Sequence, residues 1–142
     1  MDSSPVCLDA SVIVRLVMAD PLGETITSLL RSWASEDRAV LAPTLLPFEV
    51  ANALHRYRRQ GILTSEAAEE ALAAALALPI RLYSEPRLHR RALRLAERFS
   101  LPAAYDCHYL ALAEILGAPF WTADGKLVRA VGPALDWIHL LE

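Results

Sequence analysis

The stretch VCLDASVIVRLVM, residues 6–18, decides the fold of this chain. It opens with a short apolar run that ends at the acid Asp9, and a longer apolar stretch begins at Ser11 and extends to Met18. Such a pattern predicts a buried strand followed directly by a helix, with the Ser11 hydroxyl as N-cap. This order is the first half of a strand–helix–strand unit.

The same alternation continues to the end of the chain. We expect further strands at residues 39–42, 80–83, 119–122 and 135–140. We expect further helices at residues 24–35, 44–60, 65–78, 84–99, 103–116 and 124–131. Short strands separated by helices indicate a parallel sheet that is covered on both faces. The predicted fold class is therefore α/β, a three-layer α/β/α sandwich with a short-stranded, mainly parallel central sheet.

Length and composition fit one folded domain over residues 1–142, with 54% apolar and 22% charged residues. The alanine-rich stretch 67–78 is too short to cross a membrane. Acidic Asp2 argues against a signal peptide, and the widely separated Cys7 and Cys107 favour two free core thiols. These features predict a cytoplasmic protein without a membrane partner.

The formal net charge of −3 argues against a purely electrostatic RNA-binding module, which would normally be basic. An enzyme that gathers acids in one pocket can be acidic overall and still bind phosphate locally.

Two acids follow predicted strands. Asp9 ends the first strand, and Asp124 lies two residues beyond Thr122 in the fourth. In doubly wound sheets, functional sites form beyond the carboxyl ends of the strands. Each acid could instead cap the next helix.

Two further acids lie near the starts of predicted helices. Asp106 lies on an apolar stripe with Tyr109 and Leu110, in a helix that is apolar nearly all round. Glu49 lies in the first turns of its helix. A contact to backbone N–H groups or to the helix dipole is the alternative role for both.

A doubly wound sheet would bring all four acids to one edge. Like charges about 4 Å apart repel by roughly 4 kcal/mol at a surface-like dielectric, so such a cluster needs a cation. Oxygen ligands select a hard divalent ion, Mg²⁺ or Mn²⁺. That combination suits hydrolysis of a phosphodiester.

Four segments in this order resemble the PIN-domain ribonucleases of bacterial toxin–antitoxin pairs, the VapC-like proteins. They are CLDASVIVRL (7–16), PFEVANAL (47–54), AAYDCHYLALAE (103–114) and WTADGKL (121–127), which together cover essentially the whole chain.

The resemblance implies that Asp9, Glu49, Asp106 and Asp124 form the acidic metal-binding and catalytic set. It also implies supporting roles for Ser11, Thr122 and Asn52. The implied activity is a Mg²⁺- or Mn²⁺-dependent endoribonuclease that leaves a 5′-phosphate and a 3′-hydroxyl. The implied partners are the RNA substrate, a cognate antitoxin and a second copy of the chain in a homodimer.

One departure from the family pattern concerns the metal. Some relatives carry a further acid just after the position of Asp124, where this chain has Gly125, Lys126 and Leu127. The number of metal ions therefore stays open, as do the RNA and its cleavage motif.

Two basic residues near the acids, Lys126 and Arg15, are candidates for contacting substrate phosphate. The arginine stripe of residues 87–98 is read as a solvated face, although a phosphate-binding role is the alternative. The four histidines show no zinc-ligand spacing, and the three tryptophans are read as core residues.

Other enzyme and regulator classes also place an acid after the first strand. A haloacid-dehalogenase-type phosphatase needs a second acid where this chain has Ser11. A receiver domain would show an acidic pair at the end of the first strand and a lysine after a late strand, and only Lys126 partly fits that pattern. A non-catalytic PIN-type module that binds RNA or a protein partner is the remaining alternative.

Overall fold

The computed structural model describes residues 3–142 and contains one five-stranded sheet. Its strands are β1 (Val6–Leu8), β2 (Val40–Pro43), β3 (Ile80–Tyr83), β4 (Phe120–Thr122) and β5 (Ile138–Leu140). Every neighbouring pair is parallel, in the order β3-β2-β1-β4-β5.

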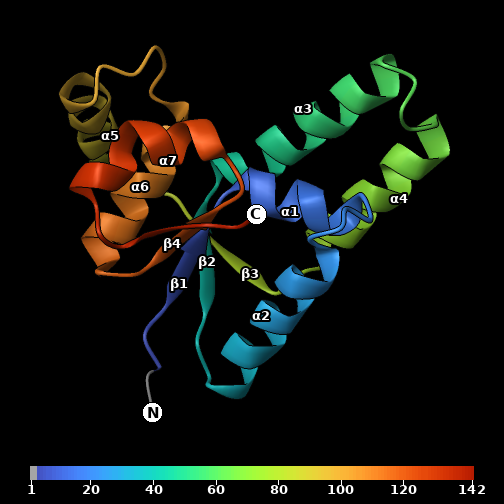
Figure 1. The fold of residues 1–142 in the computed structure, drawn as a ribbon, viewed down its shortest axis with the longest axis horizontal. Helices are drawn as coiled ribbons and strands as arrows, with labels where there is room; N and C mark the ends of the chain where they lie inside the picture. The colour runs from blue at the N-terminus through green and yellow to red at the C-terminus, as the bar shows by residue number, and fades with distance from the viewer. Residues whose placement is uncertain (1–2) are drawn as a thin grey trace.

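Helices cover both faces of this sheet (Figure 1). They are α1 (Ala10–Val17), α2 (Gly23–Ser35), α3 (Leu45–Arg59), α4 (Ser65–Leu76), α5 (Pro86–Arg98), α6 (Tyr105–Leu116) and α7 (Gly125–Val131), followed by the 3-10 turn η1 (Gly132–Ala134). In Figure 1, α5, α6 and α7 lie to the left of the strands, and α1, α2 and α4 lie to the right. The expected three-layer α/β/α sandwich is confirmed.

The connection order creates a crevice beside β1. From β1 the chain proceeds to β2 on one side, and it returns later to place β4 on the other side. The register pairs Cys7 with Phe120 and Leu8 with Trp121. Such a reversal of strand order opens a crevice beyond the carboxyl ends of the two strands. The residues that follow Leu8 and Thr122 therefore face a common space.

The starts of two helices are built differently from a simple hydroxyl cap, and the expectation for Ser11 needs correction. Ser11 is not the N-cap of α1, because Asp9 occupies that position and its Oδ1 accepts the backbone N–H of Ser11 at 3.1 Å. Thr44 stands at the N-cap of α3 but makes no capping bond with its side chain. Its backbone is already helical there (φ −60°, ψ −11°), whereas a side-chain cap needs an extended N-cap residue.

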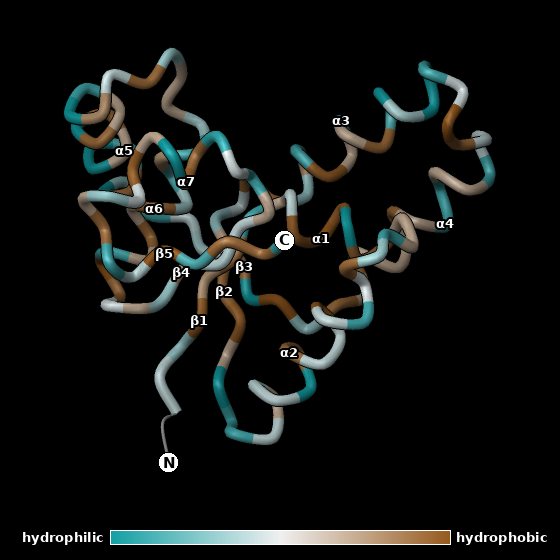
Figure 2. Tube along the Cα trace, viewed as in Figure 1, coloured by the Kyte–Doolittle hydropathy of each residue, from teal (hydrophilic) through white to brown (hydrophobic). Residues whose placement is uncertain are grey.

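The core is centred on the strands and on α6. Six residues of α6 are buried, and this helix packs against β1, β2 and β4. The ring of Tyr109 stacks on that of Phe120, and Trp33 packs against Trp121 from the opposite layer. The strands accordingly form much of the hydrophobic centre in Figure 2. Both cysteines are buried and free, as the sequence predicts.

Helices α3 and α4 form a hairpin that extends away from the sheet (Figure 1). Helix α3 begins two residues after β2, so its first turn lies at the same sheet edge as the end of β1. Within residues 3–142, no helix combines the length and the apolar character needed to cross a membrane.

Helix α6 ends at a glycine whose backbone conformation affects stability. Gly117 adopts a left-handed conformation (φ +62°), which a residue with Cβ adopts at a cost of about 1 kcal/mol. Gly117→Ala should therefore lower the free energy of unfolding by about that amount in urea titrations. Gly23→Ala is the matched control, because an added Cβ also meets open space there and φ is not positive. Equal stabilities of the two variants would contradict this explanation.

Candidate active site

The four acids singled out in the sequence line one cavity at the carboxyl edge of the sheet. Its volume is about 680 Å³. Asp9 follows β1, Asp124 follows β4, Asp106 lies in the first turn of α6, and Glu49 lies just beyond the first turn of α3. Four separate segments thus contribute one carboxylate each.

Asp9 is the most deeply buried of the four, with 4% of its surface exposed. Its Oδ1 accepts bonds from the Ser11 hydroxyl at 2.5 Å and the Ser11 backbone N–H, and its Oδ2 accepts the Thr122 hydroxyl at 2.6 Å. Burial raises the pKa of Asp9 to about 7, and the nearby charge of Asp106 adds to this rise. The two hydroxyls oppose it because they stabilise the ionised form.

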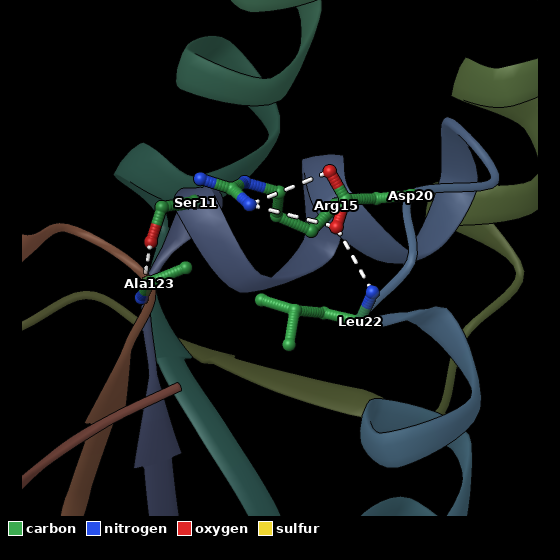
Figure 3. A network of polar contacts seen from close by, with 5 residues as sticks. All are labelled: Ser11, Arg15, Asp20, Leu22 and Ala123. Carbon is green, nitrogen blue, oxygen red and sulfur yellow. Dashed lines mark hydrogen bonds and ion pairs between the residues drawn. The ribbon is translucent and has the colours of Figure 1, made fainter. Parts of the chain in front are cut away.

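Ser11 and Thr122 connect the two halves of the sheet at this point. The Ser11 hydroxyl accepts the backbone N–H of Ala123 at 2.9 Å, a contact drawn in Figure 3. The Thr122 hydroxyl accepts the backbone N–H of Asp124 at 3.0 Å. Each hydroxyl therefore donates to Asp9 and accepts from the segment after β4. This arrangement fixes the Asp9 carboxylate relative to the backbone of Asp124.

Asp124 caps α7. Its Oδ1 accepts the backbone N–H groups of Lys126 at 3.0 Å and Leu127 at 3.3 Å. The capping role considered for Asp9 and Asp124 is thus real for both. It is compatible with a place in the cavity, because the capping bonds of Asp124 use one carboxylate oxygen and leave Oδ2 out of the cap.

Glu49 is held by a residue that sequence reasoning assigned only to an apolar stripe. The buried Tyr109 donates its phenolic O–H to Glu49 Oε1 at 2.5 Å. Burial and this bond to a carboxylate raise the pKa of Tyr109, so it remains a donor at any physiological pH. Its position three residues after Asp106 is the sequence signal, since both then lie on one helix face.

Asp106 differs from the other acids in its local contacts. Among the described residues, no backbone N–H group at the start of α6 donates a hydrogen bond to its carboxylate, and Ala104 occupies the N-cap. Burial raises the pKa of Asp106 to about 6, with further increases from the charges of Glu49 and Asp124. No capping bond is therefore present at Asp106, although it lies in the first turn of α6, and burial opposes its ionised form.

The four acids line the same cavity, but among the described residues their carboxylates do not form a compact cluster. Within residues 3–142, no three His, Cys, Asp or Glu side chains stand as a ready-made ligand set for a metal ion. The carboxylates are nonetheless close enough to influence one another, because the charge of Asp106 raises the pKa of Asp9 and the charges of Glu49 and Asp124 raise that of Asp106. Repulsion keeps such groups apart until a cation offsets it.

Of the other candidate residues from the sequence, Arg15 and Asn52 line the cavity and Lys126 does not. Arg15 lines the cavity and forms an ion pair with Asp20 at 3.4 Å (Figure 3). Asn52 also lines the cavity and is exposed. Lys126 is exposed on the first turn of α7 and is not among the residues that line the cavity.

Several residues read as structural do have structural contacts. All five arginines of α5 are exposed, and Arg91 pairs with Glu114 of α6. His108 contacts His89 at 3.0 Å, away from the acids, and His139 stacks on Trp121. A phosphate-binding role for the arginine stripe gains no support from these contacts.

The cavity also contains residues that sequence reasoning did not place there. They are Phe48, Arg56, Tyr57 and Tyr105. Phe48 and Tyr105 directly precede the two helix-borne acids Glu49 and Asp106. That adjacency is the signal that could have identified them.

Comparison with known proteins places this arrangement in a family. The PIN domain model matches residues 6–132. Ribonuclease VapC1 of Mycobacterium tuberculosis is 32% identical over 131 residues, covering 88% of this chain and 93% of the relative. Ribonuclease VapC3 of Pyrobaculum aerophilum is 30% identical over 132 residues, with 90% and 95% covered.

Solved structures agree with the fold. The structure of PAE2754 from Pyrobaculum aerophilum has a TM-score of 0.67 at 26% identity and covers 93% of this chain and 90% of its own. VapC20 of Mycobacterium tuberculosis has a TM-score of 0.62 at 23% identity, with 88% and 94% covered, a likeness of fold. The chain belongs to the PIN-domain family and, within it, to the VapC ribonucleases.

Proposed function

We propose that this protein is a divalent-metal-dependent endoribonuclease, the toxin of a toxin–antitoxin pair, with Asp9, Glu49, Asp106 and Asp124 as metal ligands and catalytic residues. The observation that carries the proposal is the convergence of these four carboxylates on one cavity at the strand-order reversal. The curated relatives are named as ribonucleases, and they align over most of the chain.

The chemistry of the donor set fits a hard cation. All four groups supply carboxylate oxygens, which Mg²⁺ and Mn²⁺ prefer. The raised pKa values of Asp9 and Asp106 express first the cost of burying a carboxylate and second the cost of holding several negative charges near one another. When bound, the cation supplies Lewis-acid chemistry and offsets the charge of the carboxylates and of the phosphodiester.

The residues around the acids keep this set in place. Ser11 and Thr122 orient Asp9, and Tyr109 orients Glu49 through its short hydrogen bond. In the hydrolysis, water oxygen bonds to phosphorus and the bond to the 3′-oxygen breaks. The 3′-oxygen takes up a proton, and the phosphate stays on the 5′ side. A rigid carboxylate frame favours this reaction because it needs little reorganisation.

Three further polar residues are proposed to contact the substrate or to support the residues that do. Arg15 and Lys126 are proposed to pair with phosphates on either side of the cleaved bond, and Asn52 to support the site. The location of Arg15 and Asn52 in the cavity wall supports this assignment. For Lys126 the support is its position two residues after Asp124.

The wider biology follows from the family. We propose a cytoplasmic protein of one domain, residues 1–142, that forms a homodimer and is inhibited by a cognate antitoxin. Exposed apolar side chains outside the cavity, such as those of Ile62 and Leu76, are compatible with protein interfaces. Light scattering after gel filtration measures the oligomeric state directly.

Replacing one acid tests the catalytic proposal. Asp106→Asn should lower the rate of RNA cleavage with Mn²⁺ by at least about 100-fold, because it removes a charge directed at the cation while preserving shape. Cleavage of a labelled RNA in a gel assay measures the rate, and circular dichroism checks the fold.

The matched control for this test is Asp136→Asn. Asp136 is exposed and does not line the cavity, so this variant should cleave at the wild-type rate. Full activity of Asp106→Asn would refute the assigned role. Wild-type protein that binds RNA but cuts none, with no response to metal, would favour a non-catalytic module.

The pKa shifts predict how stability depends on pH and metal. Asp9 and Asp106 have raised pKa values, so the metal-free native state retains protons that the unfolded chain releases. Their stabilising contribution is present below about pH 4 and is lost as the pH rises through 6 to 7. Mn²⁺ should therefore raise the Tm clearly at pH 8 and little at pH 5, where protons compete with the cation.

Differential scanning fluorimetry measures this effect, with Asp106→Asn as the comparison. The Tm of the metal-free variant should decline less between pH 5 and pH 8 than that of wild type. The expected difference is a few degrees, since about 1 kcal/mol corresponds to roughly 3 °C in a chain of this size. Parallel pH profiles for the two proteins would show that Asp106 carries no such shift.

A further inference from the structure

Two large aromatic side chains stand exposed at the acidic cavity. Phe48 is 73% exposed and Tyr105 is 64% exposed, and both line the same cavity as the four acids. They come from α3 and α6, and each directly precedes a cavity acid along its helix. The cavity thus combines charged groups with two solvent-facing rings from different segments.

Packing of the fold does not account for these rings. The core aromatic residues Tyr109 and Phe120 are buried, at 1% and 0% exposure. The other strongly exposed apolar residues, Ile62, Leu76 and Leu93, do not line the cavity. Single exposed apolar side chains are ordinary on protein surfaces. Two rings at one charged cavity instead match a ligand that has both flat apolar faces and charges.

We propose that Phe48 and Tyr105 are base-stacking residues of this site, whose rings contact unpaired bases of an RNA strand while its backbone crosses the acids. This inference rests on the proposed ribonuclease function. A ring stacks on any exposed base, whereas bases in a duplex are already stacked on one another. Each ring is the chain neighbour of an acid, so a stacked base would adjoin the phosphate that the acids hold through a cation.

The charges in the cavity wall agree with this ligand. Arg15 and Arg56 line the same cavity as the rings and can pair with backbone phosphates. The acids alone would repel the phosphates of RNA. The two arginines and the divalent ion would attract the phosphate backbone, while the rings would stack on the bases. An acidic peptide is a poorer fit, because the four carboxylates would repel it and contact with the rings would not offset that repulsion.

Binding of short RNAs tests the inference. The probe is a fluorescein-labelled ten-nucleotide single-stranded RNA of mixed sequence, with the same strand in a duplex and an abasic version as comparisons. Binding is measured by anisotropy with Mn²⁺ in the Asp106→Asn background, which limits cleavage. Phe48→Ala and Tyr105→Ala should each weaken binding of the single strand by about 5- to 100-fold, the range known for base stacking on aromatic residues.

Several controls separate stacking from structural effects. Tyr105→Phe and Phe48→Trp keep a flat ring and should retain affinity, and Leu93→Ala removes an equally exposed apolar side chain elsewhere. The abasic strand and the duplex should bind wild type and the double alanine variant alike. In the active background, the double variant should raise KM for the single strand and leave the Mn²⁺-induced rise in Tm unchanged.

The outcomes distinguish this inference from the proposed function. If wild type cleaves RNA and the double variant binds and cleaves the single strand equally well, stacking is refuted and the nuclease stands. If wild type cleaves nothing yet its affinity depends on the rings, stacking stands and the nuclease fails. If the variants change the oligomeric state while RNA affinity is unchanged, the rings form an interface between copies, and stacking is refuted.

Discussion

The hydrogen bonds between Asp9, Ser11 and Thr122 are the interaction on which the site depends. Asp9 follows β1, whereas Thr122 ends β4, and the 2.6 Å bond between their side chains spans the point where the strand order reverses. Because both hydroxyls also accept backbone N–H groups of the segment after β4, the same three side chains fix the entry to α7. One polar cluster thereby aligns two acids that are 115 residues apart in sequence.

This alignment has an electrostatic cost that explains the chemistry. Bringing Asp9, Asp106, Glu49 and Asp124 to one cavity raises the pKa of the first two, because burial and like charges oppose ionisation. The cost is offset when a divalent cation binds the oxygens. In the proposed function, the metal would therefore contribute to stability as well as to catalysis. Three of the acids are oriented by other groups: Glu49 by Tyr109, Asp9 by Thr122, and Asp124 by the backbone N–H groups that it caps.

The cavity is lined both by four acids and by two exposed aromatic rings, and we propose that these two groups recognise different parts of the RNA. Carboxylates and a cation act on the backbone, which is the same in every RNA. Phe48 and Tyr105 present flat apolar faces from two different helices, and these distinguish unpaired from paired bases without reading a particular base. In α3 and α6, the residue proposed to contact a base thus directly precedes a residue proposed to take part in cleavage: Phe48 precedes Glu49, and Tyr105 precedes Asp106.

The sequence by itself determined the α/β class, the parallel sheet and the four acids, because short apolar runs, helix caps and strand-end acids are local signals. Residues 80–83, for example, form a strand as predicted, and Gly117 ends α6. The sequence misassigned the N-cap of α1, since Asp9 and Ser11 are both good caps and backbone geometry chooses between them. Only the tertiary structure decided that Tyr109 holds Glu49 and that Phe48 and Tyr105 share a cavity. The members of each pair are about 60 positions apart in sequence, and no local pattern encodes a distance across the fold.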